Sequence, residues 1–168
     1  MLATATKNQI LLARVVVGLI AAFLLAGAFT YGFSAEVRAR TWHDLLERPD
    51  AMMRFRFIFQ PIMALIAALH DGIEDAKLGR SPYIWTLLNS AAERSGRLAE
   101  GMIATARILL LGLVMDAIYQ LIVFETFYPA QAVIIAIALG FVPYLLLRGP
   151  IERVARWRGV GPSANGVQ

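Results

Sequence analysis

Long apolar runs alternate with charged segments along this chain. Three of the runs are long enough to cross a bilayer as helices, which requires roughly 20 apolar residues each. They cover residues 15–33, 102–124 and 130–147. We therefore expect an all-α integral membrane protein, a helical bundle in which residues 1–168 form a single membrane domain.

A fourth apolar run, residues 57–69, is too short for a regular span and contains Gln60 and Pro61. Such a length is typical of an interfacial or re-entrant segment. From Ile62 onward the large apolar residues follow helical spacing, and charged residues occupy the rest of the helical wheel. We therefore expect cytoplasmic interfacial amphipathic helices in this region, with the interfacial or re-entrant segment at about residues 55–80.

The charges between the runs predict the topology. The segment after the last run is rich in arginine, whereas the turn at residues 125–129 has no basic residue. Because cytoplasmic loops are enriched in Lys and Arg, we expect a cytoplasmic C-terminus that ends in a flexible tail, residues 159–168. Three spans with the N-terminus outside are favoured, although this leaves Lys7 and Arg14 outside. The alternative is an arrangement of four spans with the N-terminus inside.

Composition agrees with a membrane protein, since 58% of the residues are hydrophobic and the mean hydropathy is +0.61. The chain has no cysteine, which excludes disulfides, thiolate metal sites and cysteine nucleophiles. Its net charge of +4 comes mainly from arginines that flank the apolar runs. These arginines are typical of cytoplasmic loops, so nucleic acid is not an expected partner.

Asp116 lies near the middle of the run 102–124. A charged side chain at the centre of a span costs a few kcal/mol, so it should face protein or water rather than lipid. Tyr119 and Gln120 follow at i+3 and i+4 and share its helix face. This intramembrane polar site is compatible with a helix-packing role or with binding of a proton or cation.

Two further patterns predict contacts. Small residues spaced by four let helix backbones approach closely, and they recur in the first and last spans. The two stripes are Gly18, Ala22 and Ala26, and Ala132, Ala136 and Gly140. Arg54 and Arg56 alternate with phenylalanines, a combination suited to anionic lipid headgroups. We therefore expect lipid-headgroup contact at these two arginines.

Candidate metal ligands gather in one place, at His70, Asp71, Glu74 and Asp75. Charged residues on the wet side of an interfacial helix are common, so this is a weak signal for a metal site. The string from Asp71 to Arg80 resembles the start of the CDP-alcohol phosphotransferase signature. Its spacing differs, however, and the downstream glycine and paired aspartates are missing. With no nucleophile or phosphate-binding motif either, we expect no enzyme and no cofactor.

Four strings, FQPIMALIAA, DGIEDAKLGRSPYIW, MDAIYQ and PYLLLRGP, resemble those of a group of small inner-membrane proteins of proteobacteria. The resemblance implies a bacterial inner-membrane location and carries no activity. We expect a non-enzymatic accessory or structural subunit that packs against a larger membrane complex. The alternative is a self-associating ion- or proton-coupled transporter or channel that uses Asp116. A third hypothesis is a metal-dependent lipid-acting enzyme.

Overall fold

Four long helical rods make up this computed structural model, which describes residues 5–32, 39, 42–43, 51–123 and 125–161, with only the backbone at 51–54. The first three rods are α1 (Lys7–Tyr31), α3 (Ala51–Lys77) and α5 (Ala91–Val123). The fourth joins α6 (Pro129–Ala136), the π-helix η1 (Ile137–Phe141) and α7 (Val142–Trp157), while α4 (Tyr83–Asn89) is a short connector. The described residues contain no strand, so the all-α expectation is confirmed.

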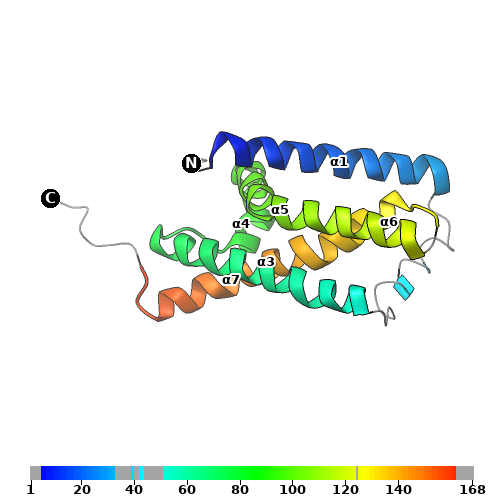
Figure 1. Cartoon of the computed structure of the whole chain (residues 1–168). Coiled ribbons are helices and arrows are strands. Elements are labelled where there is room, and N and C mark those ends of the chain that lie inside the picture. Colours follow the sequence, from blue (N-terminus) through cyan, green and yellow to red (C-terminus); the bar gives the residue numbers. More distant parts are fainter. Residues whose placement is uncertain (1–4, 33–38, 40–41, 44–50, 124, 162–168) are drawn as a thin grey trace.

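The rods alternate in direction (Figure 1). At one end of the molecule, α1 and α5 begin and α3 and α7 end. The short helix α4 lies at the same end. We call this the charged end, because Asp75, Arg97 and Arg148 meet there. At the opposite end, the Tyr31 hydroxyl donates a hydrogen bond to the Phe127 carbonyl oxygen and joins the end of α1 to the start of α6.

Four helices are long and apolar enough to cross a membrane, and they include residues Phe55–Lys77 of α3. The short segment expected at 57–69 is therefore part of a longer continuous helix, and Pro61 lies inside it. By length and composition the four-span alternative fits these helices, and the preference for three spans is not supported. The apolar run counted from the sequence stopped at Arg56, whose side chain has a partner inside the molecule, and at the polar His70.

Local sequence explains several helix ends. Thr6 and Gln9 form a capping box before α1, in which the Thr6 side chain accepts from the Gln9 N–H and the Gln9 side chain accepts from the Thr6 N–H. α1 ends at Gly32 with φ 61°, and α3 is followed by Gly79 with φ 64°. Positive φ favours glycine, so both turns are encoded locally.

The face that α3 buries is formed by small residues. These are spaced by four: Ala64, Ala68, Gly72 and Ala76. The larger apolar residues point outward: Ile62, Leu65, Ile66, Leu69 and Ile73. A Cβ on Gly72 would lie 2.9 Å from the Arg148 carbonyl oxygen, so the backbones of α3 and α7 nearly touch there. The helix expected at the membrane surface instead packs along α7, because its small residues permit this close approach.

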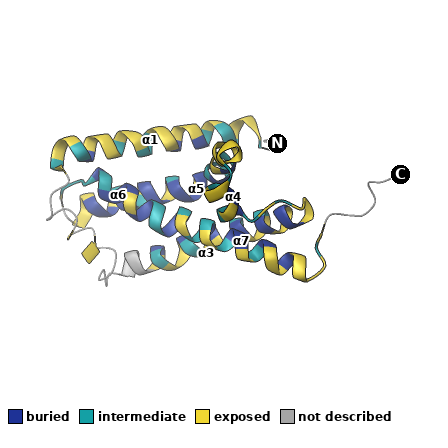
Figure 2. Ribbon diagram, turned by 180° about the vertical axis from the view of Figure 1, so that it is seen from behind, coloured by how far each residue is buried: buried dark blue, intermediate teal, exposed yellow. Residues whose placement is uncertain are grey.

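α1 is a peripheral helix that packs on α5 and α6 and is exposed over most of its length (Figure 2). It buries Ala13, Val16 and Gly27, and a Cβ on Gly27 would lie 2.5 Å from the Ala130 Cβ. The stripe of Gly18, Ala22 and Ala26 is exposed, and no atom lies within 4 Å of a Cβ built on Gly18. Within this chain the stripe is not a contact face.

The second stripe lies inside the molecule. Ala132, Ala136 and Gly140 are all buried, and a Cβ on Gly140 would lie 3.2 Å from the Ile108 Cγ2 of α5. The π-helix η1 ends at Phe141, two residues before Pro143. Proline has no N–H to donate and crowds the preceding turn, which explains the irregular hydrogen bonding at this point. These small residues place α6 and η1 close to α5.

Candidate functional site

The intramembrane polar site lies in the interior of the molecule. Asp116 and Gln120 are fully buried, and Tyr119 is 4% exposed. The Gln120 side-chain amide donates to Asp116 Oδ2, and the Gln120 Oε1 accepts from the Tyr128 N–H at 2.6 Å. Gln120 therefore connects the carboxylate to the turn that leads into α6.

Arg56 is the counter-ion of Asp116. Its Nη1 lies 2.5 Å from Asp116 Oδ1, and its Nε donates to Gln60 Oε1 at 2.7 Å. Gln60 Nε2 in turn donates to the Ile108 carbonyl oxygen at 3.2 Å. Arg56 is only 3% exposed, so its expected contact with lipid headgroups is corrected. The Arg54 side chain lies outside the described residues.

This network joins α3 to α5 in the part of the molecule that the apolar rods enclose. A buried ion pair repays its desolvation only if its remaining hydrogen-bonding groups are also satisfied. Gln60 and Gln120 supply such hydrogen bonds on the two sides of the pair. A Cβ on Gly112 would lie 2.3 Å from Gln60 Nε2, so glycine leaves the space that this amide occupies. The arrangement fixes the packing of two helices.

A second group of buried charges lies at the charged end. Asp75 of α3 receives a bidentate contact from Arg148 of α7, with Nε at 2.7 Å and Nη2 at 3.0 Å. Arg97 Nη1 lies 2.9 Å and Arg80 Nη1 3.4 Å from Asp75 Oδ1. Glu100 lies 3.2 to 3.5 Å from the same three arginines. This Asp75 cluster connects α3, α5 and α7.

Two tyrosines pack against the Asp75 cluster. Arg148 lies 4.4 Å from the centre of the Tyr83 ring, and its Nη1 donates to the Tyr144 hydroxyl at 2.5 Å. The Tyr144 hydroxyl donates to Asp71 Oδ2 at 2.7 Å. The Tyr83 hydroxyl donates to the Arg97 carbonyl oxygen, and burial raises the pKa of Tyr83 to about 12. The Tyr83 phenol therefore stays protonated near neutral pH, and both hydroxyls act as hydrogen-bond donors.

The four candidate metal ligands do not converge. The His70 side chain is 83% exposed, and Glu74 is 53% exposed and lies 3.7 Å from Lys77. Asp71 faces Tyr144, while Asp75 faces arginines. Among the residues that the structure describes, no group of three or more such side chains could hold a metal ion. The arrangement therefore gives the hypothesis of a metal-dependent enzyme no geometric support.

A cleft of about 830 Å³ opens at the charged end, lined by residues of α1, α3 and α5 and by Arg148 of α7. α1 and α3 each pack on α5, so the cleft lies between them. Its apolar lining includes Leu12, Ile103 and Ala104. Arg107 also lines it, is exposed, and forms no ion pair or hydrogen bond within the described part of the chain. We call this space the α1–α3 cleft.

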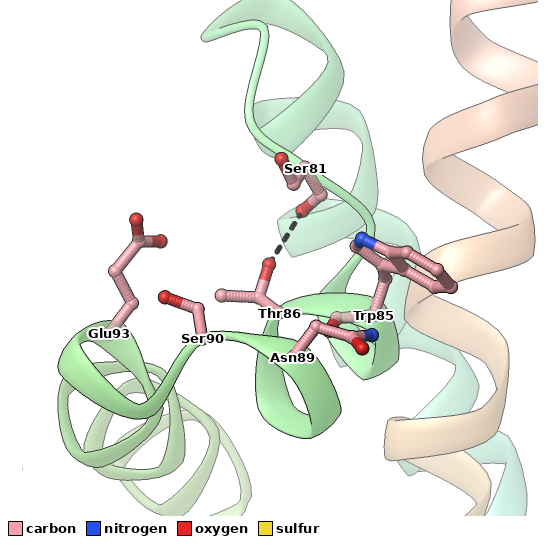
Figure 3. Close-up of a pocket in the computed structure, with 6 residues that line it drawn as sticks. All are labelled: Ser81, Trp85, Thr86, Asn89, Ser90 and Glu93. Carbon is pink, nitrogen blue, oxygen red and sulfur yellow. Dashed lines mark hydrogen bonds between the residues drawn. The ribbon is translucent and has the colours of Figure 1, made fainter.

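A smaller hollow of about 190 Å³ lies beside α4 (Figure 3). Six residues line it: Ser81, Trp85, Thr86, Asn89, Ser90 and Glu93. The Thr86 hydroxyl donates to the Ser81 carbonyl oxygen at 3.4 Å, an interaction that closes the turn before α4. Of these side chains only Glu93 is charged, and the volume lies below the roughly 300–1,000 Å³ usual for sites of small ligands.

Helical spacing in the sequence identified Asp116, Tyr119 and Gln120 as site residues. It identified neither the role of Arg56 nor the Asp75 cluster. Arg56 and Gln60 stand four residues apart, a spacing that can place two polar side chains on one buried helix face.

No family model matches the chain, and neither does any curated protein or solved structure. The resemblance to a proteobacterial inner-membrane group stays a prediction.

Proposed function

We propose that this chain is a non-enzymatic integral membrane protein of the bacterial inner membrane, which serves as an accessory or structural subunit of a larger membrane complex. The partner contacts the outer face of α1. One observation carries the proposal: Gly18, Ala22 and Ala26 are exposed on a helix that the rest of the chain scarcely buries. Small residues at this spacing let a foreign helix approach the α1 backbone closely.

The two buried charge networks support a structural role for the polar residues. Asp116 interacts with Arg56 and Gln120, and Asp75 interacts with three arginines. A carboxylate that couples transport must exchange its proton or cation with water. Asp116 is fully buried and does not line the α1–α3 cleft, so its surroundings favour the packing role over the transporter alternative.

Native extraction tests the partner contact. We expect the tagged protein, taken from its own membranes in a mild detergent, to carry a stoichiometric foreign subunit. Gly18→Leu should lower its recovery about tenfold, equivalent to about 1.4 kcal/mol of association, because the leucine blocks close approach. Val17→Leu is the control, since Val17 is equally part of α1 and 47% exposed but lies off the stripe. Mass spectrometry of the intact assemblies measures the ratio.

Three results would reject the accessory role. The first is a lone monomer from the native membrane, and the second is undiminished partner recovery in Gly18→Leu. A pure homo-oligomer would also reject it and would move the transporter alternative to the front, because three or four spans are few for a pore in one chain.

We also propose that the charged end faces the cytoplasm, with both termini on that side. α1 begins and α7 ends at the charged end (Figure 1), and Lys77, Arg80 and Arg94 lie near the helix ends there. The positive-inside rule therefore favours this orientation. It keeps the predicted cytoplasmic C-terminus and moves the N-terminus to the same side, as in the four-span alternative.

Single cysteines test this topology directly, because the natural chain has none. We expect a membrane-impermeant maleimide added to intact spheroplasts to label Glu125→Cys, which lies in the turn before α6. Asn8→Cys and Gly161→Cys should be labelled only after the membrane is opened. Labelling of Asn8→Cys from outside would instead restore the three-span arrangement with an external N-terminus.

A further inference from the structure

We propose that the α1–α3 cleft binds the headgroup of an amine-bearing zwitterionic phospholipid, namely an ethanolamine phospholipid. The phosphate lies on Arg107, and the ammonium group faces Asp71 and Glu74. This binding site goes beyond the accessory role, because no residue of the α1 stripe lines the cleft.

Arg107 supplies the first part of the argument. It belongs to an apolar stretch of α5 that is a candidate span, and within the described part of the chain no group pairs with it. A guanidinium at membrane depth is costly unless water or an anion compensates it. Its planar donors match the oxygens of a phosphate in a bidentate arrangement. The cleft that it lines offers the space for such an anion.

The opposite wall has the complementary charge. Asp71 and Glu74 of α3 line the cleft, and within the described residues the Glu74 carboxylate pairs only with the distant Lys77, at 3.7 Å. The carboxylates among the lining residues outnumber the guanidinium groups by one. Arg80 and Arg148 are moreover held by Asp75 and Glu100. A headgroup with a net negative charge would therefore be matched less well than one that carries phosphate and ammonium together.

The position of the cleft favours a lipid over a free phosphoester. Leu12 and Ile103 line it, so an acyl or glycerol portion finds an apolar surface beside the charges. The helices on its two sides expose large apolar residues, including Leu11 of α1 and Ile66 of α3. The volume of about 830 Å³ also lies within the roughly 300–1,000 Å³ usual for sites of small ligands.

Lipid titration of the full, delipidated protein tests the assignment. In native mass spectrometry, phosphatidylethanolamine should bind about fivefold more tightly than phosphatidylglycerol, a preference equivalent to about 1 kcal/mol. Arg107→Gln should weaken phosphatidylethanolamine binding about tenfold. Glu74→Gln should reduce the preference between the two lipids. Arg14→Gln is the matched control, because Arg14 is an exposed arginine of α1 that does not line the cleft.

Three results would overturn the proposal. Unchanged phosphatidylethanolamine binding in Arg107→Gln would place the lipid elsewhere. Equal or tighter binding of phosphatidylglycerol would exclude the zwitterionic headgroup. Competition by soluble glycerophosphoethanolamine at the same concentration as the lipid would indicate a soluble ligand. Because Arg107 has no described partner, its variant should fold normally, and unaltered thermal stability of the variant verifies this. Partner recovery through α1 is measured separately, so the two proposals can fail independently.

Discussion

Replacing Arg56 with methionine should destabilise the folded protein by about 3–5 kcal/mol. The substitution keeps an unbranched apolar side chain but removes the guanidinium, which leaves Asp116 as a fully buried carboxylate without its counter-ion. Removal of one partner from a buried ion pair typically costs this much, because the other charge stays desolvated. The unfolding free energy, measured by titration with a denaturing detergent and followed by circular dichroism, gives the loss.

A double variant separates the pair from its parts. In Arg56→Met with Asp116→Leu, no buried charge is left alone, so most of the stability should return. Arg153→Met is the control for removal of an arginine, and since Arg153 is exposed its effect should stay within about 0.5 kcal/mol. If Arg56→Met were as mild as this control, the ion pair would not hold α3 to α5.

The expected loss also changes how variants of Asp116 are interpreted. Asp116→Leu should weaken the chain itself, because the buried Arg56 then loses the carboxylate that balances its charge. Loss of a complex or of ion flux in that variant would therefore not identify a partner contact or a coupling site. The exposed α1 stripe is the better place to test association, since a side chain at Gly18 would meet nothing from the other described helices. Function and folding can be separated there.

The sequence predicted the helices better than their partners. Apolar length identified three of the four candidate spans, and helical spacing placed Asp116, Tyr119 and Gln120 on one buried face. The counter-ion was missed because Arg56 lies 60 residues away, in a segment assigned to the membrane surface. Arginine beside aromatic residues suits a headgroup region, but it also occurs where a helix buries one arginine and exposes its aromatic neighbours. Only the position of α5, which brings Asp116 to Arg56, distinguishes a headgroup contact from a buried arginine.

The pattern of α3 was misinterpreted for a different physical reason. The helical pattern predicts Ile62, Leu65 and Ile66 as the apolar side of an interfacial helix, with charged residues on the rest of its surface. In a bilayer those residues gain nothing from leaving lipid, and close packing selects the smallest side chains instead. Ala64 and Ala68 therefore face the interior. The run of alanine and glycine spaced by four was present in the sequence and could have identified this face.

The Asp75 cluster shows what sequence alone leaves open. Asp75 and Arg148 are 73 residues apart and each lies among other charged residues, so either could simply have faced water. Long basic side chains near helix ends usually extend to the interface. Here α7 runs alongside α3 in the same direction, so both helices end at the charged end and Arg148 lies on Asp75. Topology created the contact, and local pattern could not reveal it.

Replacing Asp75 with alanine should therefore be the second severe change, again with a loss of about 3–5 kcal/mol. Arg148 and Arg97, both nearly fully buried, would lose the carboxylate that they share, and Glu100 touches them only at 3.3 to 3.5 Å. Unpaired buried guanidinium groups repel each other and stay desolvated. Thermal unfolding followed by loss of the monodisperse peak in size-exclusion chromatography measures the effect.

Two neighbouring variants make this result specific. Glu74→Ala removes a carboxylate one residue away that is half exposed, so its effect should stay within about 0.5 kcal/mol. Asp75→Asn keeps an acceptor for the guanidinium donors and removes only the charge, so it should fall between the two. If Asp75→Asn matched the natural protein while Asp75→Ala failed, hydrogen bonding would dominate the cluster. If Asp75→Ala behaved like Glu74→Ala, the cluster would contribute little, and α3 would be held to α7 mainly by its alanines and Gly72.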